Sequence, residues 1–294
     1  MQLSENDILR RVRKVEIKTR GLSDEIFAGK YHTAFRGRGM SFAEVREYRV
    51  GDDVRDIDWN VTARSERPHI KVYEEERELT MMLLIDVSPS RMFGSKELTK
   101  KNIITEIAAT LAFSASKNND KVGCILFSDH IEKFIPPKKG RSHILAIIRE
   151  LVGFTPTGKS TNISEALRYL VGVNKKRATT FLLSDFINAE ADNPKLEDAL
   201  KIASSKHDIM AIRVYDKRDA ELPNIGIIEI EDAESGRTEW VDTSSRRVRD
   251  FWADSYRERN ERIASLLRHN RVDIADIATD DDYVVNLIKM FKQR

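Results

Sequence analysis

Hydrophobic and polar positions follow two alternating periods from residue 79 to the end of the chain. Leu79–Val87 is a nearly continuous apolar run, and Thr179–Ser184 and Ile209–Tyr215 have the same character. Such runs are typical of strands buried on both faces of a parallel sheet. A further strand is expected over 272–277. Between the strands, apolar residues recur three and four positions apart, which predicts helices near 103–115, 142–152, 162–171, 194–203, 245–269 and 281–291.

Two segments predict antiparallel hairpins. Lys121–Phe127 and Ile131–Ile135 are separated only by Ser-Asp-His, and a second hairpin is expected over 226–241. Strands that alternate with helices predict an α/β fold with a doubly wound sheet. Ligands of such sheets bind at the carboxyl ends of the strands, so candidate chemistry is sought at that edge.

The first 78 residues have a different pattern. Apolar residues at helical spacing predict a helix over 5–19. The stretch over 35–68 is dense in Arg and Asp, and no period holds across it, so it is expected to be mostly loop with short elements. The chain is therefore expected to divide into an N-terminal segment, 1–78, and an α/β domain, 79–294, with a hairpin insertion near 217–244.

The balance of charge argues against a protein that coats polyanions. The 294 residues include 50 Lys and Arg against 48 Asp and Glu, a formal net charge of +2, and we expect no nucleic-acid partner. The single cysteine, Cys124, excludes a disulfide scaffold and favours a reducing compartment. The longest apolar run, Met81–Ile85, is far shorter than the ~20 residues of a membrane span. Because the N-terminal residues also lack the apolar core of a signal peptide, we expect a cytoplasmic protein without an integral membrane segment.

Oxygen-bearing side chains follow the buried strand over 79–87. Asp86, Ser88 and Ser90 place a carboxylate and two hydroxyls on one side of a tight turn. Thr161, just before a predicted helix, and Asp185, at the end of a second strand, belong to neighbouring loops. Mg²⁺ requires oxygen ligands in an octahedral arrangement, so these residues predict a cation site. Alternatively, the two serines only cap the next turn.

A second motif competes with this interpretation. Gly153–Ser160, with the sequence GFTPTGKS, fits the G-x-x-x-x-G-K-[ST] pattern of a nucleotide-binding P-loop. A P-loop follows a buried strand, so that the next helix points its N-terminus at the phosphates. Here the preceding segment, HILAIIRELVG, has helical spacing, and Pro156 stiffens a loop that needs free N–H groups. We favour the cation site and keep P-loop nucleotide binding as the alternative.

Other catalytic chemistry is sparse in the sequence. The six histidines are scattered without the spacing of zinc ligands, and no G-x-S-x-G motif occurs. No set of Ser, His and carboxylate residues can be placed together. We therefore expect a protein that is not an enzyme.

The Asp-x-Ser-x-Ser turn, with a Thr and an Asp in two further loops, resembles the metal-ion-dependent adhesion site of von Willebrand factor A domains. The order of predicted elements over 79–294 matches that fold. Ahead of it, Gly51–Trp59, with the sequence GDDVRDIDW, and Thr62–Arg64 resemble the signature of a bacterial family, domain of unknown function 58. The resemblance extends over roughly 36–294 and includes further short segments: Phe93–Ser95, Phe127–Asp129, Leu183–Phe186, Leu222–Pro223 and Glu234–Gly236.

The resemblance implies a mostly parallel sheet with one antiparallel edge strand, and a metal-dependent binding module. Ser88, Ser90 and Thr161 would ligate Mg²⁺ or Mn²⁺ directly. Asp86 and Asp185 would act through waters or through hydrogen bonds to the hydroxyls. The open position of the metal would take an Asp or Glu carboxylate from a protein partner. Similar proteins are usually encoded beside MoxR-type AAA+ ATPases, which implies an adaptor role for such an ATPase in assembling or activating complexes.

One departure from the family pattern concerns this site. Family members commonly have Met directly after the second Ser, whereas here Arg91 comes before Met92. The departure places a long cation beside the proposed metal, where it would weaken metal binding or select an acidic partner.

The Arg/Asp-rich segment has two interpretations. In one, Arg46, Arg49, Arg55 and Arg64 form a docking surface with the neighbouring aspartates. In the other, the Arg and Asp residues form an ion-pair lattice that pins this segment to the α/β domain, with Trp59 as a buried anchor. Buried Arg–Asp pairs are often structural, and we favour the lattice.

Overall fold

The computed structural model describes residues 10, 13, 41–65, 67–74, 79–92, 99–187, 194–231 and 237–292. The chain forms two compact units, a smaller one over Phe35–Leu79 and a larger one that includes Thr80–Arg294. The helix expected over 5–19 lies outside the described residues, except for Arg10 and Arg13.

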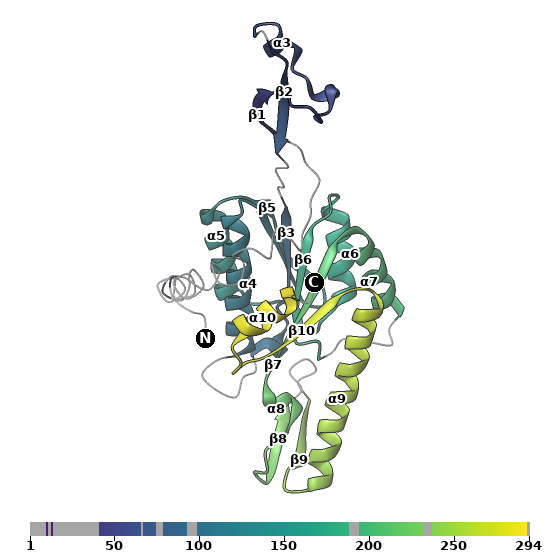
Figure 1. Cartoon of the computed structure of the whole chain (residues 1–294). Helices are drawn as coiled ribbons and strands as arrows, with labels where there is room; N and C mark the ends of the chain where they lie inside the picture. The colour runs from purple at the N-terminus through teal and green to yellow at the C-terminus, as the bar shows by residue number, and fades with distance from the viewer. Residues whose placement is uncertain are drawn as a thin grey trace. The chain divides into compact units, whose positions relative to one another are not determined.

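A six-stranded sheet forms the centre of the larger unit (Figure 1), with the strand order β10-β7-β6-β3-β4-β5. Neighbouring strands are parallel except for β4 and β5, which pair antiparallel at one edge. This is the doubly wound, mostly parallel sheet with one antiparallel edge strand that the sequence and its family resemblance predict. The strands are β3 Thr80–Asp86, β4 Lys121–Phe127, β5 Ile131–Lys138, β6 Thr179–Ser184, β7 Asp208–Tyr215 and β10 Asp273–Ala278.

Helices cover both faces of the sheet (Figure 1). On one face lie α4, α5 and α10, and Phe291 of α10 packs edge-on against Phe181 of β6, with ring centroids 6.1 Å apart. On the other face lie α6, α7 and α9. Strand side chains alternate between the two faces, so apolar strands supply both cores. The helices are α4 Lys100–Lys117, α5 Arg141–Gly153, α6 Ile163–Val173, α7 Pro194–Lys206, α8 Lys217–Ala220, α9 Arg246–His269 and α10 Tyr283–Lys292.

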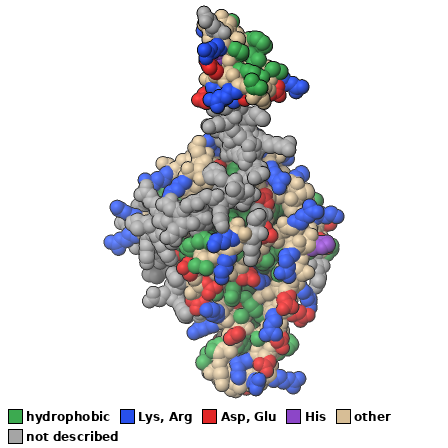
Figure 2. All heavy atoms as spheres, in the orientation of Figure 1, with side chains coloured by type: hydrophobic (Ala, Val, Ile, Leu, Met, Phe, Trp, Pro, Cys, Tyr) green, Lys and Arg blue, Asp and Glu red, His purple; other side chains and the backbone are tan. Residues whose placement is uncertain are grey.

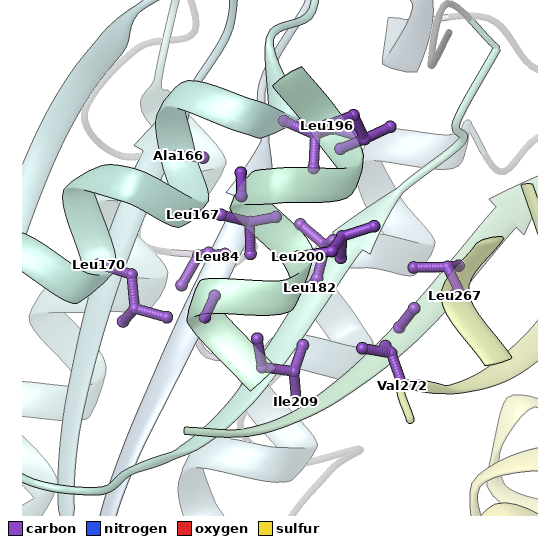
Figure 3. Packing of buried hydrophobic residues seen from close by; sticks show 14 of the residues in the cluster. Leu84, Ala166, Leu167, Leu170, Leu182, Leu196, Leu200, Ile209, Leu267 and Val272 are labelled. Carbon is purple, nitrogen blue, oxygen red and sulfur yellow. The ribbon is translucent and has the colours of Figure 1, made fainter. Parts of the chain in front are cut away.

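The face beneath α6, α7 and α9 contains a continuous apolar cluster (Figure 3). Leu84 and Leu182 come from the two central strands, and Leu167 and Leu200 meet them from α6 and α7. All four side chains are fully buried. Because protein cores pack as densely as organic crystals, this cluster holds the sheet rigid below the loops that carry the candidate site.

The elements expected over 79–294 are present, with bounds that differ by a few residues. The strand over 179–184 has the expected bounds, and the second hairpin is formed by β8 Ile227–Glu231 and β9 Thr238–Asp242. The short helix α8 was not predicted. Across the described ranges, the structure contains no helix that is both long and apolar enough to cross a membrane.

The smaller unit contains two strands in and beside the stretch where the sequence predicts mostly loop. β1 Ser41–Glu47 and β2 His69–Glu74 pair antiparallel, and their register shifts between Phe42 and Glu44. Between them lie a 3₁₀ turn, η1 Val54–Asp56, and a one-turn helix, α3 Trp59–Thr62. The short elements within 35–68 agree with the prediction of loop with short elements, and β2 lies just after that stretch; the irregularity along β1 interrupts its period of two, so the strand itself was not predicted.

Leu182→Ala should lower the free energy of unfolding by about 2–5 kcal/mol, because it removes buried methyl groups and leaves a cavity. Ile202→Ala on α7 is the control, since Ile202 is 49% exposed, and its effect should stay within about 0.5 kcal/mol. Urea denaturation measures both changes. Equal losses in the two variants would contradict the place of Leu182 in the core.

Candidate metal centre

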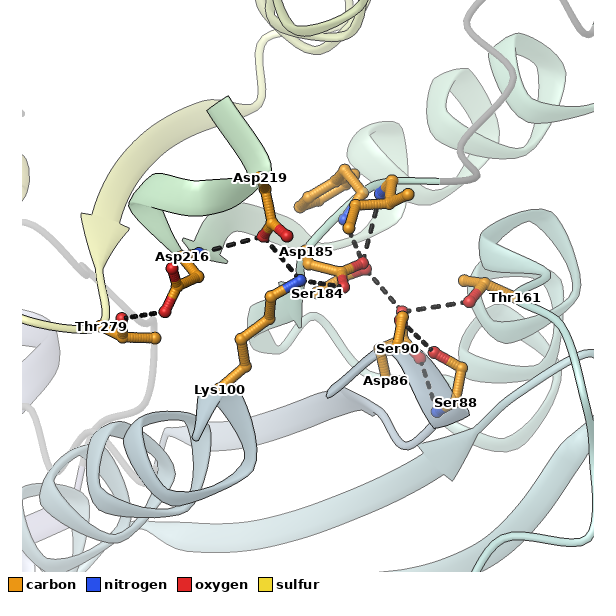
Figure 4. Close-up of polar contacts among 12 residues, drawn as sticks. Asp86, Ser88, Ser90, Lys100, Thr161, Ser184, Asp185, Asp216, Asp219 and Thr279 are labelled. Atoms are coloured by element: carbon orange, nitrogen blue, oxygen red, sulfur yellow. Dashed lines mark hydrogen bonds and ion pairs between the residues drawn. The ribbon is translucent and has the colours of Figure 1, made fainter. Parts of the chain in front are cut away.

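Asp86 is the last residue of β3, and its side chain is buried at the carboxyl edge of the sheet (Figure 4). A buried carboxylate needs hydrogen bonds. Its Oδ1 accepts from the Ser88 N–H at 2.9 Å, and its Oδ2 accepts from the Ser184 hydroxyl at 2.6 Å. The Thr161 hydroxyl donates to the same Oδ2 at 3.4 Å. Asp86 therefore joins its own loop, the end of β6 and the loop before α6.

Besides the Ser184 hydroxyl, the three hydroxyl oxygens of the predicted ligands lie at this edge of the sheet. The Oγ atoms of Ser88 and Ser90 are 3.1 Å apart, in the turn that enters η2 Pro89–Met92, and both side chains are buried. Adjacent corners of a Mg²⁺ octahedron with bonds of about 2.0–2.1 Å are about 3 Å apart, so this separation suits two ligands of one ion. The Thr161 hydroxyl, which donates to Asp86, offers a third oxygen of the kind that Mg²⁺ prefers. These four predicted site residues are brought together.

Asp185 follows β6 in a tight turn beside them. Its Oδ1 accepts from the Ile187 N–H at 3.2 Å, and the Ser184 hydroxyl oxygen accepts from the Phe186 N–H at 3.0 Å. Phe186 has a φ of 55°, a left-handed conformation that few non-glycine residues adopt. Its side chain is buried in the core cluster, and the surrounding contacts hold this strained turn in place. The direction of the Asp185 side chain is thereby fixed.

A buried lysine that the sequence analysis missed completes the cluster. Lys100, the first residue of α4, is fully buried, and its Nζ lies 3.0 Å from Asp185 Oδ2 and 2.8 Å from Asp219 Oδ2 (Figure 4). Burial alone would lower the pKa of Lys100, but the two carboxylates raise it above its ordinary value, so the ammonium stays charged. The predicted site residue Asp185 is therefore at the site in an ion pair, and Asp219 joins it from α8.

Negative charge exceeds positive charge in this cluster. The carboxylates of Asp86, Asp185 and Asp219 are opposed by a single ammonium, which leaves two negative charges uncompensated among these groups. Burial, and then the nearby Asp185, raise the pKa of Asp86 to about 6. A divalent cation would balance the two charges, and the hydroxyls offer the oxygen ligands that Mg²⁺ prefers. The residues therefore fit the ion that the family resemblance implies.

Hydroxyls are essential to any metal site here. Among the residues that the structure describes, no group of three or more His, Cys, Asp or Glu side chains is placed to hold a metal ion. The sequence predicts the Arg91 side chain beside the metal, but this side chain is not among those that the structure describes. The backbone of Arg91 belongs to η2.

The loop that carries Thr161 is held by the turn between β4 and β5. Glu132 Oε1 accepts from the N–H groups of Thr157 and Gly158 and from the Ser128 hydroxyl, each at 2.8 Å. Burial alone would raise the pKa of Glu132, but these hydrogen bonds lower it below its ordinary value. The residue after Thr161 also donates its N–H to the Ser128 carbonyl at 2.7 Å. Contacts within the protein therefore set the position of Thr161.

These contacts argue against the P-loop alternative for Gly153–Ser160. The motif follows α5 rather than a strand, so it lacks the strand–loop–helix context. Two of its amides donate to Glu132, and the Lys159 N–H donates to Asp129 Oδ2 at 3.1 Å. Carboxylates of the protein thus occupy N–H groups that phosphates would need, and the loop does not have the geometry of a P-loop.

In the smaller unit, aspartates serve mainly as caps. Arg46 forms a two-bond fork with Asp52, and both N···O distances are 2.8 Å. Asp53 and Asp58 instead accept from backbone N–H groups at the starts of η1 and α3. Among the described residues of the smaller unit, this fork is the one Arg–Asp ion pair of the lattice that the sequence predicts.

The surface of the smaller unit is partly apolar (Figure 2). Trp59 is 70% exposed on its own unit, because a unit this small has little interior to cover an indole ring; its role as an anchor against the α/β domain stays a prediction. Val50 and Val54 are exposed as well. Within the described part of the chain, the side chains of three exposed arginines form no hydrogen bond or ion pair: Arg49, Arg55 and Arg64.

Comparison with known proteins identifies a family. A model of the family "Protein of unknown function DUF58" matches residues 44–262. An uncharacterised protein of Mycobacterium tuberculosis strain H37Rv, Rv1480, is 27% identical over 287 residues, which cover 96% of this chain and 88% of that protein. A second uncharacterised protein, MAV169 of Mycobacterium avium, is 26% identical over 162 residues, which cover 54% of this chain and 93% of that protein.

Solved structures that match this chain at low sequence identity include a protein described as von Willebrand factor type A. The conserved hypothetical protein BatB from Bacteroides thetaiotaomicron has a TM-score of 0.49 at 15% identity, with 73% of this chain and 98% of that chain covered. A von Willebrand factor type A protein from Catenulispora acidiphila has a TM-score of 0.38 at 15% identity, with 67% and 44% covered.

Glu132→Gln should destabilise the protein by about 2 kcal/mol at neutral pH, because a charged acceptor of several hydrogen bonds is lost. The pKa of Glu132 is lowered on folding from its ordinary value near 4.5, so its contribution is present above that value and is lost as the pH falls through the lowered pKa. Denaturant midpoints of wild type and variant should therefore converge as the pH falls below that ordinary value. Glu165→Gln, at an exposed position in α6, is the control. A gap that stays constant with pH would contradict the role of the ionised carboxylate.

Proposed function

The chain belongs to the DUF58 family of proteins of unknown function, and we propose that its larger unit is a metal-dependent protein-binding module rather than an enzyme. The observation that carries this proposal is the set of three hydroxyls around the buried carboxylate of Asp86, in a cluster with two excess negative charges. An ion held mainly by neutral hydroxyls keeps much of its positive charge. Such an ion attracts a carboxylate at a position that the protein leaves open.

In this proposal the site residues have distinct roles. Ser88, Ser90 and Thr161 hold Mg²⁺ or Mn²⁺ directly. Asp86 orients the hydroxyls, in keeping with its hydrogen bond from Thr161, and Asp185 acts from outside the ligand shell. Arg91 adds a second cation at the rim, where a guanidinium can form a two-bond fork with the incoming carboxylate.

The proposed partner is a protein that presents Asp or Glu on an exposed loop. We assign this role to a MoxR-type AAA+ ATPase, with the present chain as its cytoplasmic adaptor in complex assembly or activation. The support for this partner is the family resemblance, together with the anionic ligand that the site chemistry favours.

The smaller unit offers a second contact for an acidic partner. Exposed apolar residues lie on this unit, together with arginines whose side chains form no ion pair with a described residue. The unit would therefore match a segment of a partner that is both acidic and apolar. Arg46, held in its fork with Asp52, supports this surface. The surface consists of Arg49, Arg55, Arg64, Val50, Val54 and Trp59.

Mg²⁺ or Mn²⁺ at 100 times its Kd should stabilise the protein by about 2.7 kcal/mol, which raises Tm by about 5–10 °C for a domain of this size. Ser88→Ala should remove most of the shift, whereas Ser205→Ala, at an exposed position on α7, should leave it unchanged. Because protons compete for an Asp86 carboxyl whose pKa is about 6, the shift should shrink below that pH. Thermal denaturation with metal and with EDTA checks this, and no shift in the wild type would show that the site holds no metal.

The purified MoxR-type ATPase should be retained by the wild-type chain in Mg²⁺ and released by EDTA. Asp86→Ala should abolish retention, and Arg91→Ala should weaken binding by about 1–3 kcal/mol, the value of a hydrogen bond to a charged group. Equal binding in EDTA would restrict any metal to a structural role. Docking would then pass to the Arg/Asp segment at 46–64, and replacing Arg49, Arg55 and Arg64 together by Gln would abolish retention instead.

A further inference from the structure

Lys100 occupies a position that is costly for a cation. Its side chain is fully buried, and charged side chains are almost never fully buried unless they are paired. It is also the first residue of α4, where the positive end of the helix dipole disfavours positive charge. The two carboxylates that offset these costs belong to Asp185 and Asp219, and one of them is a residue of the candidate metal centre.

We propose that Lys100 is a positioning residue that holds Asp185 outside the ligand shell of the cation and so keeps the bound ion attractive to a partner's carboxylate. This inference rests on the proposed function and adds a residue that determines the specificity of the same site.

Both oxygens of Asp185 have partners within the protein. Oδ2 lies 3.0 Å from Lys100 Nζ, and Oδ1 accepts from the Ile187 N–H at 3.2 Å. Asp86 differs, because both of its oxygens accept from the residues that surround the proposed ion. To ligate the ion directly, Asp185 would have to give up one of these contacts or share an oxygen that already accepts a hydrogen bond.

Lys100 is itself anchored by Asp219. Its Nζ lies 2.8 Å from Asp219 Oδ2, and that oxygen also accepts from the Asp216 N–H at 3.0 Å as part of the capping box of α8. The carbonyl of Asp219 accepts from the Trp252 indole N–H at 2.9 Å. The ammonium therefore has a fixed position from which it holds Asp185.

The net charge that an incoming carboxylate meets at the bound ion depends on where Asp185 lies. With Asp185 paired to Lys100, a divalent ion has the carboxylate of Asp86 and neutral hydroxyls around it, and a positive charge remains. If Asp185 entered the shell, two carboxylates would neutralise the ion, and little attraction for a third would remain. Lys100 thus weakens metal binding and strengthens ligand binding; because its charge alone acts in the same direction, the number of waters on the bound ion reports whether Asp185 has entered the shell.

Lys100→Met tests the proposal, with Mn²⁺ as the metal and acetate as the carboxylate probe. We expect the Kd for Mn²⁺ to fall at least tenfold. Water-proton relaxation should show fewer exchangeable waters on the bound ion, because Asp185 replaces one. Acetate should displace water from Mn²⁺ bound to the wild type and should not do so in the variant.

Two further variants keep this test informative. Lys117→Met makes the same change in net charge at the far end of α4, about 25 Å along the helix, and should behave as the wild type. Lys100→Met/Asp219→Asn removes one buried carboxylate along with the ammonium, so it guards against misfolding of the single variant, which circular dichroism would detect. The double variant should show the same tighter binding of Mn²⁺ and the same loss of bound water.

The outcomes separate this inference from the proposed function. If the wild type binds Mn²⁺ and acetate and both Lys100 variants match it, the role of Lys100 is wrong and the metal site stands. If only the Lys100 variants bind Mn²⁺, the lysine does restrain Asp185, and the proposed function of the wild type is wrong. Absence of Mn²⁺ binding in every variant overturns both.

Discussion

The arrangement of the sheet edge depends on the need to satisfy one buried carboxylate. Asp86 ends a strand in which Met81–Ile85 are apolar and buried, and a charge in that position is stable only when several donors surround it. Ser88, Thr161 and Ser184 supply them from three separate segments of the chain. Each donor fixes the conformation of its own loop, and the hydroxyls that gather around Asp86 are a result of this requirement.

Most of the fold follows from patterns that span only a few residues. β6 is buried throughout and has the apolar run Phe181–Leu183 at its centre, and α6 repeats its apolar residues because one side packs on the sheet. Such a pattern does not predict β1, since a shift of register breaks the alternation of side chains along this strand. The exposure of Trp59 on its own unit also escaped prediction, because burial of an indole ring depends on how much interior its unit has and not on the neighbouring sequence.

The candidate site was predictable to the extent that its residues end strands or begin helices. Asp86, Thr161 and Asp185 each have such a place in the sequence, and their proximity follows from the parallel sheet. Lys100 has no local signal: it precedes another lysine and reads as part of a solvated first turn, whereas its partner Asp185 is 85 residues away. Glu132 lies in a strand of the hairpin, and only the folded chain brings it to the loop before α6.

The carboxylate of Glu132 has a consequence for the kinetics of the site. By accepting from consecutive amides, it orders the loop before α6 while the protein folds, so the backbone entropy of that loop, about 1–2 kcal/mol per residue, is lost at that stage. An arriving ion would meet oxygen atoms already in place, and no loop would have to close around it. Mg²⁺ releases its water reluctantly, and dehydration of the ion, rather than motion of the chain, would then set the rate of binding.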